Sequence, residues 1–241
     1  MNTKKQRMQV CNLKVETIRK DIKNIHLGVY PPNGRVRVAA PLKTSDESIR
    51  LMVITKIPWI KKQKSKFSKQ ERQTKRDYVS GESHYFFGKR YLLNVQSTDS
   101  KPRVEIKRNK FIDLHINQDT ALEKREKVLE EFYRSEIKKH IPALVDKWEK
   151  IIGVNVKEAK VKKMKTKWGT CNPKDKRIWL NLELAKKPLN CMEYVIVHEM
   201  IHFLEKSHND KYRYLISSHL PQWEQYRNEL NNSVLGYSSW R

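Results

Sequence analysis

Apolar and polar residues alternate with the period of β-strands through much of the first half of the chain. Turn residues such as Asn33-Gly34 and Gly88-Lys89 separate these stretches. The segments that alternate in this way are residues 12–18, 24–30, 35–39, 84–87, 90–95, 104–106 and 111–116. The pattern predicts an antiparallel, β-rich region over residues 1–118, which opens as a small meander.

A basic helical segment interrupts these strands. The sequence predicts a helix from Ser45, as N-cap, to about Arg76, divided or kinked at Pro58. Residues 56–76 contain nine Lys or Arg and one acid, Glu71, with two aromatic residues interleaved. A basic helix with aromatics can bind nucleic acid. A solvated helix face with one or two core anchors is the favoured interpretation of such a run.

Helical periodicity dominates the second half. An apolar stripe from Leu122 to Trp148 predicts a long helix that begins at Asp119 or Thr120 and is kinked or divided at Pro142. Short strands are expected over 154–156, 160–164 and 177–182, and short helices over 210–218 and from residue 221 onwards. These elements predict a compact core over residues 119–241, so the expected fold class is α+β with a domain boundary near residue 118.

Between these strands and the last helices lies a segment that is apolar on most sides of a helix, which indicates a buried helix. Asn190 and Glu193 have the spacing of a capping box at its start. The segment contains His198-Glu199-Met200-Ile201-His202, an H-E-x-x-H motif. Residues four apart share one helix face, so His198 and His202 can bind one metal ion, with Glu199 placed to polarise a bound water.

The motif indicates a zinc site of the zincin type. A chain of this composition is expected to contain roughly 0.02 such matches by chance, so an accidental match is disfavoured. Catalytic zinc has three protein ligands and keeps a fourth position for water. His208 lies ten residues after His198 and is the favoured third ligand. Glu205 and His219 are its rivals, and no Met follows Met200 to form the Met-turn of metzincins.

The net charge of +24 predicts a strongly positive surface. A field of this size favours anionic partners such as DNA, RNA or acidic substrates. A lysine-rich, solvated surface without such a partner is the alternative, and composition alone leaves both open.

Three cysteines without a framework spacing favour a reducing compartment. The first residues are polar and do not form the apolar core of a signal peptide. No stretch approaches the ~18 apolar residues of a membrane span. The expectation is a cytoplasmic protein that does not enter a membrane.

Together these segments resemble the YgjP-like metal-dependent hydrolases, which are relatives of the SprT-like zinc peptidases. The resemblance covers nearly the whole chain and is sharper in the second half. The matching segments are residues 32–41, 59–60, 78–82, Trp168-Gly169-Thr170-Cys171, Leu180-Asn181, residues 193–202 and Ser207-His208-Asn209. Thr170 replaces a serine of the family, and Lys206-Ser207 precede the third histidine where the family often has Asn, which leaves substrate preference open.

The resemblance implies a zincin core with an N-terminal β-rich extension and one Zn²⁺ per chain. It implies that His198, His202 and His208 hold the zinc and that Glu199 is the general base. It also implies an active-site border formed by Trp168, Gly169, Cys171 and Asn181.

The predicted function is that of a zinc metallopeptidase acting on a peptide or protein substrate. Two alternatives remain open at this point. One is a basic, nucleic-acid-associated protein whose metal site is structural or vestigial. The other is a DNA-associated protease, by analogy with some SprT-like relatives.

Overall fold

A computed structural model of the chain describes residues 4–30, 33–69, 76–164 and 167–232. The chain divides between Arg72 and Gln73 into two compact units. Each unit has its own hydrophobic core. The sequence placed a boundary near residue 118 instead.

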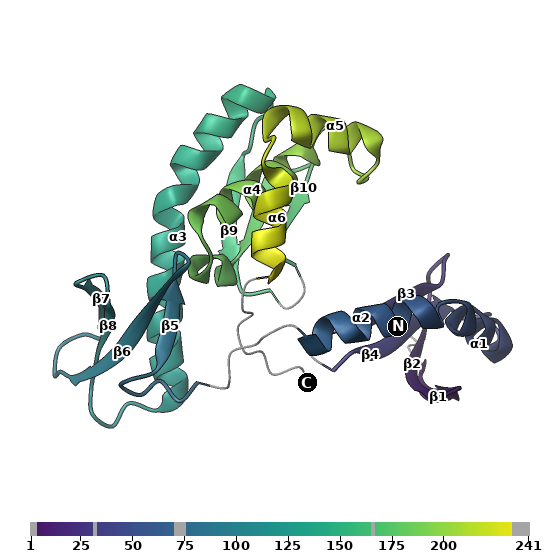
Figure 1. The fold of residues 1–241 in the computed structure, drawn as a ribbon, viewed down its shortest axis with the longest axis horizontal. Coiled ribbons are helices and arrows are strands. Elements are labelled where there is room, and N and C mark those ends of the chain that lie inside the picture. The colour runs from purple at the N-terminus through teal and green to yellow at the C-terminus, as the bar shows by residue number, and fades with distance from the viewer. Residues whose placement is uncertain (1–3, 31–32, 70–75, 165–166, 233–241) are drawn as a thin grey trace. The chain divides into compact units, whose positions relative to one another are not determined.

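The first unit is a four-stranded sheet with two helices (Figure 1). Its strand order is β1-β2-β4-β3. The strands are β1 Lys4–Val10, β2 Leu13–Lys20, β3 His26–Tyr30 and β4 Arg35–Pro41, and the helices are α1 Asp46–Thr55 and α2 Ile57–Lys69. Alternate residues of the sheet, including Val15, Val36 and Val38, share a core with Ile49 and Ile60 of the helices. Both helices therefore cover the same face of the sheet.

Local sequence explains the helices of this unit. The Ser45 side chain accepts a hydrogen bond from the backbone N–H of Ser48, which confirms the predicted N-cap. The helix breaks at Lys56, and Pro58 stands in the first turn of α2, where its missing N–H costs no hydrogen bond. Residues 31–32 of the predicted turn and residues 70–75 of the predicted helix lie outside the described residues.

The second unit begins with another four-stranded sheet, ordered β5-β6-β8-β7, and a long helix. These elements are β5 Ser83–Phe86, β6 Lys89–Ser97, β7 Arg103–Lys107, β8 Phe111–Ile116 and α3 Leu122–Ile152. Helix α3 continues through Pro142 without being divided. Leu93 and Leu114 of the sheet share one buried core with Leu129 and Tyr133 of α3. This shared core joins the strands before residue 118 to the helix after it.

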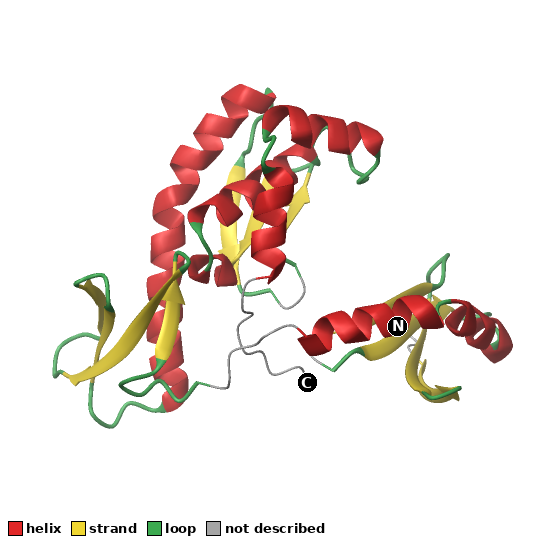
Figure 2. Ribbon diagram, viewed as in Figure 1, coloured by secondary structure: helices red, strands yellow, loops and turns green. Residues whose placement is uncertain are grey.

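The rest of the second unit is a three-stranded sheet with helices (Figure 2). Its strand order is β10-β11-β9. The elements are β9 Glu158–Lys162, β10 Gly169–Asn172, β11 Arg177–Asn181, the 3-10 helix η1 Leu182–Lys186, α4 Leu189–Ile201, α5 Asp210–His219 and α6 Trp223–Asn232. Strand β10 lies at an edge of this sheet and packs beside α4.

The fold class is α+β, as predicted, but the strands are not all antiparallel. In both four-stranded sheets the two inner strands, β2 with β4 and β6 with β8, pair in parallel. In each sheet the chain passes from the first inner strand to the far edge strand. It then turns back through a hairpin and forms the second inner strand, which lies between those two. The two sheets thus share one topology. In the described part of the chain, no helix combines the length and apolar character that a membrane crossing requires.

Candidate metal centre

Helix α4 carries the H-E-x-x-H motif through the core of the second unit. Nine of its 13 residues are buried, as the apolar sequence predicts. The predicted capping box is wrong. Pro188 is the N-cap, while Glu193 accepts hydrogen bonds from Lys147 and from the Trp148 indole of α3. Packing against α3, in place of a reciprocal cap, fixes the start of the helix.

Three histidines meet at the C-terminal end of α4. His198 lies in its last turn, His202 is the C-cap, and His208 precedes α5. The Nε2 atom of His208 lies 3.1 Å from Nε2 of His202 and 3.2 Å from Nε2 of His198. Two nitrogens on one tetrahedral Zn²⁺, each ~2.0–2.1 Å from it, lie about 3.3 Å apart. The three imidazoles therefore fit a single ion of this kind.

The opposite ring nitrogens of two of these histidines have partners of their own. Nδ1 of His198 lies 2.6 Å from the hydroxyl of Tyr212, and Nδ1 of His202 lies 2.9 Å from the backbone carbonyl of Glu205. A proton on each Nδ1 can be donated to these oxygens, which leaves the Nε2 lone pairs free for a metal. Burial, with His202 and His208 nearby, lowers the pKa of His198 to about 3, so this ring is neutral at pH 7.

Of the described residues, His198, His202 and His208 form the group of His, Cys, Asp and Glu that could hold a metal ion. The two rival ligands are outside it. The carboxylate of Glu205 accepts a hydrogen bond from the backbone N–H of Ser207, and His219 lies at the far end of α5. The geometry favours His208 as the third ligand.

Tyr212 is a residue that the sequence did not single out for the site. It lies in the first turn of α5, fourteen residues after His198, and is 2% exposed. No motif spacing connects the two positions. Burial, with Tyr194 and Glu199 nearby, raises the pKa of Tyr212, so the phenol stays protonated. Its oxygen can accept a hydrogen bond from Nδ1–H of His198 in the tautomer that leaves Nε2 free for a metal.

Replacing Tyr212 by phenylalanine is expected to weaken zinc binding by roughly 10- to 100-fold, because His198 loses the acceptor that orients its ring. Competition with a fluorescent zinc chelator measures this change. Tyr214→Phe is the matched control, since Tyr214 belongs to the same helix and is 72% exposed. Equal zinc affinity in Tyr212→Phe and wild type would show that the hydroxyl does not support the site.

Glu199 is 5% exposed and lies against β10. A Cβ atom on Gly169 would come within 2.7 Å of a Glu199 carboxylate oxygen, so only glycine allows this approach. The Cys171 thiol hydrogen-bonds Glu199. Burial raises the pKa of Glu199 to about 7, and burial beside this carboxylate raises the pKa of Cys171 to about 12. Gly169 and Cys171, which the family resemblance assigned to the active-site border, thus both lie close to Glu199 of the motif helix.

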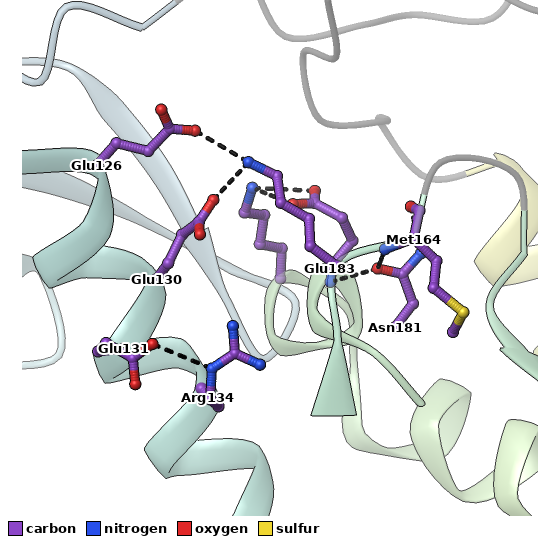
Figure 3. A network of polar contacts seen from close by, with 9 residues as sticks. Glu126, Glu130, Glu131, Arg134, Met164, Asn181 and Glu183 are labelled. Carbon is purple, nitrogen blue, oxygen red and sulfur yellow. Dashed lines mark hydrogen bonds and ion pairs between the residues drawn. The ribbon is translucent and has the colours of Figure 1, made fainter. Parts of the chain in front are cut away.

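The two other predicted border residues have different surroundings. Trp168 is partly exposed, and the Lys187 ammonium lies 5.6 Å from its ring centre. Asn181 is 4% exposed and holds the backbone that precedes Trp168. Its side-chain oxygen accepts hydrogen bonds from the N–H groups of Met164 and Glu183 (Figure 3). Its amide nitrogen donates to the carbonyl oxygens of Met164 and Lys167. Asn181 therefore connects Met164, Lys167 and Glu183 by hydrogen bonds.

An ion-pair network anchors the backbone after β9 to the long helix. The Lys163 ammonium pairs with the carboxylates of Glu126 and Glu130 of α3 (Figure 3). Lys163 directly precedes Met164, which Asn181 holds from the other side. Lys163 and Met164, which follow β9, are therefore held by α3 and by Asn181.

Comparison with known proteins identifies the family of the chain. Among solved structures, the chain is similar to the metallopeptidase zymogen of Pyrococcus abyssi abylysin, with 15% sequence identity and a TM-score of 0.35 over 37% of this chain and 90% of that chain. No curated protein matches the chain. The family model of the YgjP-like metallopeptidase domain matches residues 23–233, which is most of the sequence. The chain therefore belongs to the YgjP-like metallopeptidase family.

Proposed function

We propose that the chain is a zinc-dependent peptidase in which His198, His202 and His208 bind one Zn²⁺ and Glu199 is the general base. The convergence of three imidazole Nε2 atoms, with contacts of 3.1 and 3.2 Å, carries the proposal. Structural zinc sites usually include cysteine and close all four positions. A site with three histidine ligands leaves one position for the reaction.

When bound, Zn²⁺ supplies an activated water and polarises the carbonyl of the scissile peptide bond. Glu199 accepts the proton of the attacking water and delivers it to the leaving nitrogen. Its burial excludes bulk water from the carboxylate, and the close approach of Gly169 with the hydrogen bond from Cys171 holds its side chain. These contacts keep one carboxylate orientation through both proton transfers.

The substrate is a peptide or protein segment in an extended conformation. Strand β10 pairs with β11 on one side and forms the edge of the described three-stranded sheet on the other. An extended chain can add to such an edge by backbone hydrogen bonds. Because Gly169 of β10 adjoins Glu199, a peptide on this edge passes the catalytic carboxylate. Trp168, partly exposed at the start of the strand, offers an aromatic contact.

The setting we propose is the cytoplasm. The three cysteines are free thiols, and Cys11 is exposed. Exposed free thiols suit a reducing compartment.

The experiment that tests the proposal is removal and return of the metal. Purified protein without an affinity tag is expected to contain about one Zn per chain. Dialysis against a chelator should abolish hydrolysis of an unfolded protein such as casein, and one equivalent of Zn²⁺ should restore it. Protein that takes up no zinc, or that cleaves equally well after chelation, would refute the assignment.

A further inference from the structure

The strand register defines a second surface, on the first unit. Val15, Val36 and Val38 belong to the core that the sheet shares with the helices. Because side chains alternate along a strand, the residues next to these valines face away from the helices. Pairing of Arg7 with Glu16, and of Glu16 with Arg37, aligns these residues across three strands. We call this side of the β1–β4 sheet the outer face.

The outer face is strongly basic. It includes 14 strand positions, of which six are Lys or Arg and one, Glu16, is acidic. The basic residues are Lys5, Arg7, Lys14, Lys20, Arg35 and Arg37. All of them are exposed except Arg37, which is partly exposed. Glu16 lies 3.4 Å from Arg37 and 3.7 Å from Arg35, so one carboxylate serves two guanidinium groups and most of the positive charge stays uncompensated.

The β5–β8 sheet provides an internal comparison, because it has the same topology. On its side away from α3, 12 strand positions hold three basic residues, Arg90, Arg103 and Lys107, and two acids, Glu105 and Asp113. If lysine were simply frequent throughout the chain, both sheets would have similar numbers of basic residues on these sides. Residues 1–72 hold 18 Lys or Arg and five Asp or Glu, so +13 of the net +24 falls in fewer than a third of the residues. The positive charge is thus concentrated in this unit.

An aromatic ring lies among these charges. Tyr30 packs over Gly28 of the same strand, and a Cβ atom on Gly28 would come within 2.7 Å of the Tyr30 ring. The guanidinium of Arg37, the cross-strand partner of Gly28, lies 5.5 Å from the ring centre. Tyr30 is partly exposed. A glycine on an open sheet face lets the ring lie against the backbone beside an arginine.

We propose that the outer face of the first unit binds single-stranded nucleic acid. The Lys and Arg side chains would contact successive phosphates, and Tyr30 with Arg37 would stack a base. Single strands are bound by combinations of a basic surface with aromatic and guanidinium planes, because every base has a stacking face. An acidic protein segment would match the charge, but its carboxylates would not stack on the Tyr30 ring. This inference does not depend on the proposed peptidase activity.

The test is fluorescence anisotropy of a labelled oligothymidylate, about 20 nucleotides long, with the full chain. The triple variant Lys5→Gln, Lys14→Gln, Arg35→Gln removes three charges from the outer face. We expect it to weaken binding and to make the slope of log K against log salt less steep by about 2, since each phosphate contact on a single strand contributes ~0.7. Treatment with a chelator should leave binding unchanged, which separates this result from any failure of the zinc site.

The matched control removes three charges from the helices on the other side of the sheet. Lys56→Gln, Lys61→Gln, Lys62→Gln changes three exposed residues, and the neighbouring Trp59 is 41% exposed, so this basic helix is the rival surface. We expect its effect on affinity and salt slope to be small. Tyr30→Leu keeps an apolar cover on Gly28 and should weaken binding of the single strand more than binding of a duplex. Circular dichroism of each variant checks folding, and Lys14→Gln alone replaces the triple variant if the latter is unfolded.

Three results would overturn the proposal. The first is a failure of the wild type to bind, and the second is an equal loss of affinity in the two triple variants, which would indicate only the general charge. The third is competition by a polyglutamate peptide as strong as competition by the oligonucleotide, together with no effect of Tyr30→Leu. That combination would assign the outer face to an acidic protein segment.

Discussion

Replacing Glu199 by glutamine is expected to lower kcat/KM for peptide hydrolysis by about 10³-fold while zinc content stays at about one per chain. General acid–base groups typically contribute 10²- to 10⁴-fold to rate, and the amide cannot accept the proton of the attacking water. Glutamine has nearly the shape of glutamate, so the close contact with Gly169 is retained. The three histidines are untouched, which separates catalysis from metal binding.

Initial rates with a fluorogenic peptide, measured beside metal content by mass spectrometry, check this result. Glu205→Gln is the matched control. It makes the same chemical change beyond the end of the same helix, where the carboxylate accepts a hydrogen bond from the N–H of Ser207. We expect Glu205→Gln to keep most of the activity. If Glu199→Gln cleaved the peptide as fast as wild type, Glu199 could not be the general base.

Replacing His202 by alanine should remove both zinc and activity. Two imidazoles remain, and the Nε2 contact of 3.1 Å between His202 and His208 is lost. Zinc content is expected to fall from about one per chain to near zero after dialysis, and hydrolysis to fall to background. Thermal unfolding supplies a readout that does not depend on activity. Excess zinc at ~100 times its Kd stabilises a folded site by about 2.7 kcal/mol, and His202→Ala should show no such gain.

His219→Ala is the control for this variant. His219 was a rival ligand in the sequence, and it lies in the last turn of α5, outside the group of three histidines. It should keep zinc, activity and the thermal shift. Loss of zinc from His219→Ala, with retention in His202→Ala, would require a different ligand set.

Much of the candidate site could be predicted from sequence because its central spacing is local. Two histidines four residues apart share a helix face wherever that helix lies. The apolar residues around them predict a buried helix, and α4 is buried. Gly169 and Cys171 entered only through the resemblance to a family, because nothing in their spacing connects them to Glu199. Their contact depends on the packing of β10 beside α4.

Sequence patterns failed where the outcome depended on elements distant in the chain. Asn190 and Glu193 have the spacing of a capping box, yet Glu193 binds Lys147 and Trp148 of α3. Side-chain alternation identified most of the strands but not their direction. The parallel pairing of β2 with β4 follows from the route of the chain between them, and alternation is the same in parallel and antiparallel strands.

Short-range periodicity was enough to predict the α+β class, the buried motif helix and the two histidines on one face of that helix. The sequence also limited the third ligand to a few candidates. The tertiary structure alone decided that His208 meets the other two, that Tyr212 and the carbonyl of Glu205 hold their far nitrogens, and that the basic side chains of β1, β2 and β4 share one face. The residues in these contacts are distant in sequence and are brought together by turns and strand pairing. Their geometry therefore depends on the packing of the whole unit.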